Sequence, residues 1–93
     1  MTATPEAIKI TNLAAQAAAD KQGEQLVAID VTSVNPLNDV YLWVSAKNER
    51  LVSAIADEIE FKLQEVGVEA RRREGKTTSR WIMLDFGDLA VHV

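Results

Sequence analysis

The residues best suited to chemistry, Asp85, Asp88 and His92, all fall in the closing segment of the chain. Two carboxylates placed across a turn can bind a metal ion or take part in acid–base catalysis. Asp85-Phe86-Gly87 also matches the metal-binding triplet of protein kinases. The sequence, however, has neither a glycine-rich phosphate loop nor a His-Arg-Asp catalytic loop. A hairpin turn with Gly87 at positive φ explains these residues better, because Asp and Gly are favoured in turns.

His92 alternates with Val91 and Val93, so we expect it on the opposite face of a strand from these valines. As a general base it would need a nucleophile and an acid that orients it. No nucleophile-elbow sequence surrounds the serines considered, which are Ser45, Ser53 and Ser79. We therefore predict that His92 packs against Trp81 or against a partner, and we predict no catalytic residue.

Two tryptophans, Trp43 and Trp81, are the most informative large side chains. An aromatic residue on a strand usually belongs to the core, whereas an exposed one is a candidate binding anchor. Trp81 follows Arg80 and a polar loop, which places it near the end of a strand. Both a buried and a partly exposed position are compatible with this pattern.

Composition removes several classes of site. The chain has 93 residues, no cysteine and one histidine, which argues against a disulfide framework, a thiolate zinc site and a multi-histidine metal site. We predict no cofactor. The longest apolar run, VYLWV, is far too short to span a membrane, and MTATPEAIKI lacks the pattern of a secretory signal. These features predict a cytoplasmic protein without membrane association.

The net charge of −4 makes free nucleic acid a poor partner, because phosphate binding needs an excess of Lys and Arg. Half of the cations nevertheless cluster in one segment, at Arg71, Arg72, Arg73, Lys76 and Arg80. A solvated edge strand and loop explain this cluster better than a patch for RNA or an acidic partner. The reason is that no aromatic residue interleaves the arginines.

Two helices position these residues. Thr4 is a suitable N-cap, Pro5 fits the first helical position, and Gly23 is a suitable stop. The apolar stripe of this helix consists of Ile10, Leu13, Ala14 and Ala17. Asn48 should cap the second helix and Gly67 should end it. Its apolar face consists of Val52, Ile55, Ala56, Ile59, Leu63 and Val66.

Five strands complete the pattern. Residues 26–31 are apolar on both faces and predict an interior strand, and residues 40–46 form a second strand rich in β-formers. Residues 68–73 predict an edge strand, residues 80–85 a strand with Ile82 and Leu84 on one face, and residues 89–93 a returning strand. The order predicts a single α/β or α+β domain, residues 1–93. It would contain a mixed sheet of about five strands and two main helices.

These segments together resemble the ribosomal silencing factor family, RsfS or Iojap-like. The resemblance depends on an ordered set of residues: Asp30, Asp39, Ser45, Asn48, Arg50, Ile55-Ala56-Asp57, Glu74-Gly75, Trp81 and the segment DFGDLAVHV at 85–93. Two departures stand out. Ala46 occupies a position where the family usually has Gly, and family members continue past Val-His-Val. We therefore expect a single family domain that lacks the C-terminal tail.

The resemblance implies a nucleotidyltransferase-like fold without catalysis, and a translational repressor active chiefly under starvation. It implies binding to the large ribosomal subunit through ribosomal protein fourteen, so that the small subunit cannot join. Trp81 would then be the anchor of the interface, with Glu74, Asp85, Asp88 and His92 as polar contacts. It also leaves room for minor contact of Arg71, Arg72 and Arg73 with ribosomal RNA.

Two other classes stay open at this point. One is a degenerate nucleotidyltransferase, although no Asp-x-Asp pair occurs and the strand-to-helix loop reads SAKNER where such enzymes have a Gly-Ser loop. The other is a generic homodimerising module, because loss of the tail could expose a strand edge. For the family reading we also expect a homodimer when the protein is off the ribosome.

Overall fold

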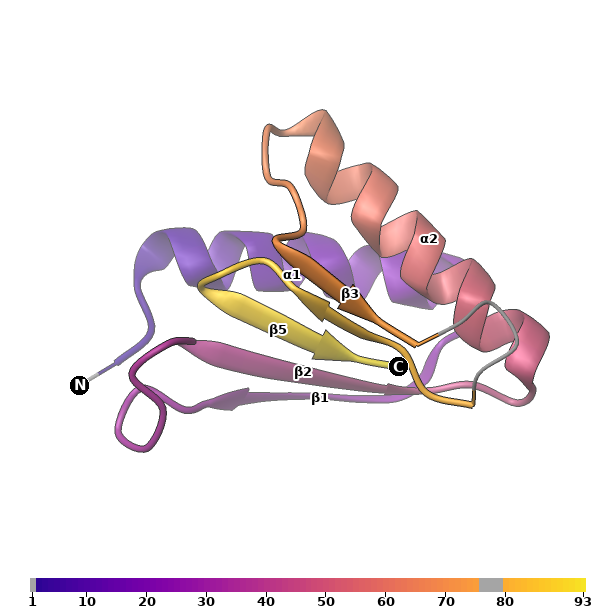
Figure 1. Cartoon of the computed structure of the whole chain (residues 1–93), viewed down its shortest axis with the longest axis horizontal. Helices are drawn as coiled ribbons and strands as arrows, with labels where there is room; N and C mark the ends of the chain where they lie inside the picture. Colours follow the sequence, from indigo (N-terminus) through magenta and orange to yellow (C-terminus); the bar gives the residue numbers. More distant parts are fainter. Residues whose placement is uncertain (1, 76–79) are drawn as a thin grey trace.

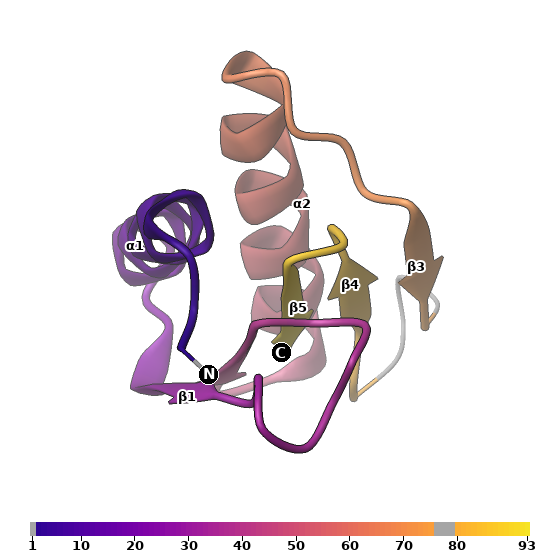
Figure 2. The same ribbon diagram turned by 90° about the vertical axis from the view of Figure 1, so that its left-hand side faces the viewer.

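The computed structural model describes residues 2–75 and 80–93, which form two layers (Figure 1). A five-stranded mixed sheet has the order β1-β2-β5-β4-β3, in which only β2 and β5 run parallel. Both helices pack on one face of it (Figure 2), which confirms the predicted α+β class. The elements are α1 Pro5–Asp20, β1 Glu24–Asp30, β2 Val40–Ser45, α2 Glu49–Glu65, β3 Arg72–Glu74, β4 Met83–Asp85 and β5 Leu89–His92.

The first helix begins as predicted, with the Thr4 hydroxyl accepting a hydrogen bond from the Ala7 N–H at 3.1 Å. Its end differs in detail. Gln22 takes the positive φ of 67°, and the N–H of Gly23 closes the motif on the Ala18 carbonyl at 2.8 Å. Gly23 is required for space, since a Cβ there would lie 2.8 Å from Val44 Cγ1.

The second helix begins at the Asn48 cap, whose side-chain oxygen accepts from the Leu51 N–H at 2.9 Å. It ends before Gly67, which has a φ of 83°. Its predicted apolar face is buried except for Val66, which lies beyond the last turn and is 57% exposed. Neither helix of the described residues is long and apolar enough to cross a bilayer.

β1 is an edge strand, and the prediction of an interior strand is wrong. Val27 is 50% exposed and Ile29 is 45% exposed, because β1 pairs only with β2 in the described sheet. The register shifts between Glu24 and Val27, where Gln25 has a φ of 51°. Such a bulge is common on edge strands.

The last three strands are shorter than predicted, and residues 68–71 are not a strand. β3 is the second edge strand, as expected. The predicted division of the fourth strand into two faces is confirmed, because Ile82 and Leu84 are completely buried under the helices whereas Trp81 is 44% exposed. Gly87 has a φ of 93° in the turn between β4 and β5, also as predicted. The loop predicted after Gly75 lies outside the described residues at 76–79.

Candidate functional site

The sheet has one face under the helices and another that no described helix covers, which we call the open face (Figure 2). Residues paired across neighbouring strands lie on the same face of a sheet. The strand register therefore places two rows of side chains across the open face. They are Val27, Trp43, His92, Met83 and Glu74 in one row, and Ile29, Tyr41, Ala90, Asp85 and Arg72 in the other.

An aromatic cluster of Tyr41, Trp43, Trp81 and His92 occupies the middle of this face. The His92 ring stacks on Trp43 with centroids 4.2 Å apart and on Trp81 with centroids 6.0 Å apart. Tyr41 meets the same imidazole edge-on at 5.5 Å. Trp43 is 43% exposed and Trp81 is 44% exposed. Large aromatic surface is thus available to solvent on both sides of a central histidine.

His92 packs against Trp81, as predicted, and more closely against Trp43. Its Nδ1 atom is buried and has no hydrogen-bond partner among the described residues. Burial holds the pKa of His92 below its ordinary value, so the imidazole is neutral at pH 7. The ring therefore acts as a flat, uncharged spacer between the two indoles.

The two aspartates of the turn differ in role. The Asp85 carboxylate accepts from the Gly87 N–H at 2.9 Å, the turn interaction expected from the sequence. Asp88 lies on the turn, with its carbonyl accepting from the N–H groups of Asp39 and Val40. Asp88 is four residues before His92, which corresponds to about 13 Å along an extended strand. In the described residues, no group of three or more His, Asp or Glu could hold a metal ion.

Glu74 lies in the same row as His92, and its carboxylate is 3.5 Å from the Arg72 guanidinium. The next residue, Gly75, has a φ of 103°, and a Cβ there would overlap the Trp81 carbonyl oxygen. The Glu74-Gly75 pair thus lets the end of β3 approach the backbone of Trp81. Of the predicted residues, Glu74 and His92 lie in one row of the open face and Trp81 stacks on His92, whereas Asp85 lies in the adjoining row and Asp88 lies apart.

The three consecutive arginines do not form one patch. Arg73 points to α2, where its guanidinium lies 2.9 Å from Asp57 and 2.7 Å from Glu60. Partial burial opposes its charge, but hydrogen bonds to these carboxylates raise the pKa of Arg73 overall. Arg72 faces the open side, and the Arg71 guanidinium rests against Gly87. Lys76 of the predicted cluster lies outside the described residues.

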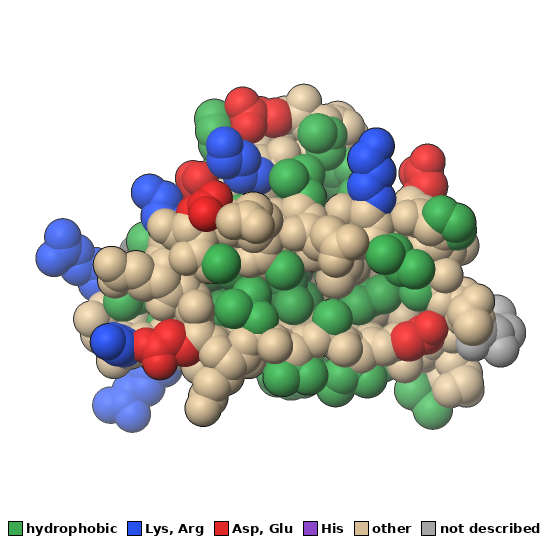
Figure 3. All heavy atoms as spheres, turned by 180° about the vertical axis from the view of Figure 1, so that it is seen from behind, with side chains coloured by type: hydrophobic (Ala, Val, Ile, Leu, Met, Phe, Trp, Pro, Cys, Tyr) green, Lys and Arg blue, Asp and Glu red, His purple; other side chains and the backbone are tan. Residues whose placement is uncertain are grey.

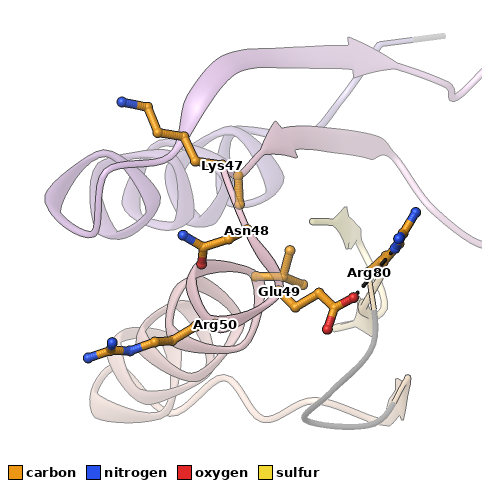
Figure 4. Close-up of a pocket in the computed structure, with 7 residues that line it drawn as sticks. Lys47, Asn48, Glu49, Arg50 and Arg80 are labelled. Carbon is orange, nitrogen blue, oxygen red and sulfur yellow. Dashed lines mark hydrogen bonds and ion pairs between the residues drawn. The ribbon is translucent and has the colours of Figure 1, made fainter.

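A hollow of about 620 Å³ lies at the start of α2, beside the SAKNER loop (Figure 4). Two of the cations that line it have carboxylate partners. Lys47 pairs with Glu24 at 3.7 Å, and Arg80 pairs with Glu49 at 3.4 Å. In Figure 4 the side chains of Lys47, Arg50 and Arg80 point in different directions. Among the residues that the structure describes here, the arrangement gives a nucleotide phosphate no set of converging cations.

Sequence reasoning missed Tyr41 and Met83 and gave Trp43 no definite role. A signal for two of them was present in the segment VYLWVS. Tyr41 and Trp43 alternate there with three aliphatic residues, which in a half-exposed strand predicts an aromatic face opposite an aliphatic one. The β propensity of that segment alone does not assign its faces.

Fold and site together define a small two-layer α+β domain with an exposed aromatic surface on its sheet. The sequence from residue 4 to residue 93 matches the family model described as "Ribosomal silencing factor during starvation". The chain therefore belongs to the ribosomal silencing factor family, a family of translation regulators, as its residues had suggested.

Individual relatives agree with this assignment. The chain is 38% identical to ribosomal silencing factor RsfS of Halalkalibacterium halodurans, over 91% of this chain and 73% of the relative. It is 34% identical to RsfS of Bacillus subtilis, over 90% and 71%. A crystal structure of a protein from Chromobacterium violaceum superposes with a TM-score of 0.87 at 30% identity, covering 91% of this chain and 71% of the other. One from Bacillus halodurans superposes with a TM-score of 0.85 at 38% identity, over 91% and 79%.

Proposed function

We propose that this protein is a cytoplasmic translational repressor that acts chiefly during starvation. It binds the large ribosomal subunit through ribosomal protein fourteen and prevents the small subunit from joining. Such a block needs only that a rigid domain occupy the docking surface, so the mechanism requires no cofactor and no chemical reaction. The observation that carries the proposal is the exposed aromatic cluster on a sheet face that the chain's own helices leave uncovered.

Trp81 is the proposed anchor of the interface. Its indole is 44% exposed, and the stacked rings of His92 and Trp43 support one side of the cluster. Tryptophans that fill a pocket on a partner commonly dominate binding energy. Glu74, Asp85, Asp88 and His92 are the proposed polar contacts around it. Glu74 and His92 are nearest to the anchor, whereas Asp88 would contact a more distant part of the partner.

Charge favours a basic partner. Residues 24–46 and 81–93, which supply β1, β2, β4, β5 and their connections, contain five carboxylates and no Lys or Arg. The positive charge lies on the helices, at their ends and around β3. A sheet surface of this kind attracts a basic ribosomal protein and raises its rate of association. Contact with ribosomal RNA stays a prediction for Arg71 and Arg72, because two carboxylates of α2 already neutralise Arg73.

Replacement of Trp81 by Ala tests the proposal. We expect a folded protein whose affinity for ribosomal protein fourteen falls by about 2 kcal/mol or more, roughly 30-fold. Phe61→Ala is the matched control, because Phe61 is 53% exposed on α2, away from the open face. Calorimetry with the purified partner and co-sedimentation with large subunits provide the two measurements. Equal affinities for the two folded variants would remove Trp81 from the interface.

The edge position of β1 favours a homodimer as a second state. Val27 and Ile29 are about half exposed on the outermost strand, beside the aromatic cluster. We propose that the free protein pairs with a second copy when off the ribosome. Light scattering with and without the ribosomal partner tests this. A dimer that persists unchanged in the presence of the partner would favour a generic dimerising module instead.

A further inference from the structure

The connection between β1 and β2, residues 31–39, carries two hydrophobic side chains that are almost entirely in solvent. Val34 is 80% exposed and Leu37 is 81% exposed. Figure 2 shows this loop on the side of the sheet away from the helices. In Figure 3 hydrophobic side chains continue along the lower rim of the molecule, the rim to which the sheet and this loop contribute. The position raises the question of what the two side chains contact.

Hydrogen bonds within the loop fix its shape. The Leu37 N–H donates to the Asn35 side-chain oxygen at 2.8 Å, and the Asn35 N–H donates to the Val31 carbonyl at 2.8 Å. The Asn35 amide also donates to the hydroxyl of Tyr41, a member of the aromatic cluster. The loop is thereby tied directly to the open face.

A second set of contacts fixes the loop to the turn between β4 and β5. The Asn38 amide donates to the Gly87 carbonyl at 2.5 Å and lies 3.4 Å from the Asp85 carboxylate. The backbone N–H of Asp39 donates to the Asp88 carbonyl at 2.7 Å. Because the loop is held on two sides, its apolar side chains can bind without a large ordering cost.

The charges around the loop define the kind of partner. Asp30 and Asp39 flank it, and residues 24–46 contain no Lys or Arg. Hydrogen bonds from the Thr32 side chain and backbone and from the Ala3 N–H hold the pKa of Asp30 below its ordinary value, so that it is ionised. Asp88 adds an exposed carboxylate on the neighbouring turn, whose Gly87 lies beside the Arg71 guanidinium. An apolar tip among carboxylates complements a basic protein surface with a hydrophobic depression.

We propose that Val34 and Leu37 form a second contact with the basic ribosomal protein, at the opposite end of the open face from Trp81. This inference depends on the proposed function. Two separated contacts would fix the orientation of the domain on its partner, which a single anchor does not. Asn38 is a positioning residue in this arrangement, because it holds the loop against the turn without reaching the exposed tip.

The double variant Val34→Ser, Leu37→Ser tests the contact. Since both side chains are exposed, we expect unchanged thermal stability and an affinity for the ribosomal protein reduced about tenfold, as for loss of two small apolar contacts. The matched control is Phe61→Ser, Val66→Ser, because these side chains are 53% and 57% exposed at α2. We expect this control to bind as the unmodified protein does. Equal affinity of the loop variant and the control would overturn the inference.

Comparison with Trp81→Ala separates this inference from the proposed function. If Trp81→Ala weakens binding and the loop variant does not, the second contact is wrong and the proposed function stands. If neither weakens binding, both are wrong. If the loop variant abolishes self-association by light scattering while partner binding is unchanged, the tip contacts a second copy, which also overturns the inference.

Asn38→Ala provides a second measurement. If Asn38 acts by holding the loop, Asn38→Ala should weaken binding in the unmodified protein. It should have no further effect in the variant that already lacks Val34 and Leu37. Additive losses in a folded triple variant would contradict the positioning role.

Discussion

The two faces of the sheet use alternate residues of the same strands for opposite purposes. On the covered face, Leu42, Leu84 and Val91 are at most 1% exposed. On the open face, Trp43 is 43% exposed only one residue away from Leu42. Stability and the proposed binding can thus be divided between the two sides of a single layer, because successive side chains point to opposite faces.

The faces also differ in chemistry. The covered face is aliphatic, as expected where helices and strands pack closely without polar atoms. The open face carries rings that combine a large apolar area with a polar group, in Tyr41, Trp43, Trp81 and His92. Such side chains tolerate solvent in the free protein and still bury a large apolar area in a complex. Substitutions on one face should therefore change folding, and substitutions on the other should change affinity.

The largest effect is expected at the centre of the covered face. Leu84→Ala removes a completely buried side chain from β4. It should lower the free energy of unfolding by about 3 kcal/mol, within the usual range of roughly 2–5 kcal/mol for such cavities. Chemical denaturation provides the measurement. A loss below about 1 kcal/mol would contradict the division between the faces, since it would mean that the core does not depend on this strand.

A comparison of two glycines tests how the open face is positioned. Gly75→Ala should lower the free energy of unfolding by about 1–3 kcal/mol, because the residue has a φ of 103° and its Cβ would overlap the Trp81 backbone. Gly67→Ala is the control, because Gly67 has a φ of 83° but a Cβ there would meet no described atom within 4 Å beyond its chain neighbours. A loss of unfolding free energy at Gly75 beyond that at Gly67 measures the cost of the steric contact with the Trp81 backbone.

The same glycine variant should affect binding. Displacement of the Trp81 backbone moves the proposed anchor. Gly75→Ala should therefore weaken binding to the proposed ribosomal partner and change the fluorescence of Trp81. Gly67→Ala should do neither. If both variants bind equally well, the close approach at Gly75 matters for folding alone.

Two neighbouring arginines on opposite faces allow a smaller test. Arg73→Met should lower the free energy of unfolding by about 1 kcal/mol, because its guanidinium links β3 to two carboxylates of α2. Arg72→Met should change it by less than about 0.5 kcal/mol, since the Arg72–Glu74 pair is largely exposed. Thermal denaturation of both variants in low and high salt provides the measurement. An equal loss of unfolding free energy in both variants would show that the contact of Arg73 with α2 adds nothing to stability.

The smallest effect is a pH dependence at the centre of the open face. The folded pKa of His92 is lowered from 6.5 by burial, so the unfolded chain binds the proton more readily. The contribution of neutral His92 to the stability of the fold is therefore present above pH 6.5. It is lost as the pH falls from there through the lower folded pKa. His92→Phe should remove this dependence of the unfolding free energy on pH.

Comparison of unfolding curves between pH 7.5 and pH 5, taken at roughly half-unit steps, measures the slope. Asp30 provides an internal reference, because its pKa lies below 3.8 and its titration falls in a separate, more acidic window. An unchanged slope in His92→Phe would show that another group titrates.

Local features of the sequence predicted most elements well. Thr4 and Asn48 act as caps, Gly67 follows the end of α2, Gly87 takes the expected positive φ, and the buried face of α2 follows the helical period. Each of these depends on residues within one or two turns of one another. The division of β4 into two faces was also predicted, because alternation identifies which side chains of a strand share a face.

The order of strands in the sheet, unlike these local features, is not set by neighbouring residues, and it explains the wrong prediction for β1. Residues 26–31 look like an interior strand by composition, yet β1 is at the edge because β5 inserts beside β2 from the other end of the chain. The same insertion assembles the aromatic cluster, since it brings His92 between Trp43 and Trp81. No local pattern records which strands become neighbours.

By itself, the sequence determined the two capped helices, the turn at Gly87, the family and the acidic balance, because each depends on neighbouring residues or on composition. Only the tertiary structure decided which apolar residues remain exposed, how the three arginines are divided, and that a histidine separates two indoles. These outcomes depend on contacts between residues far apart in the chain. Such contacts exist only after the strands have assembled in their final order.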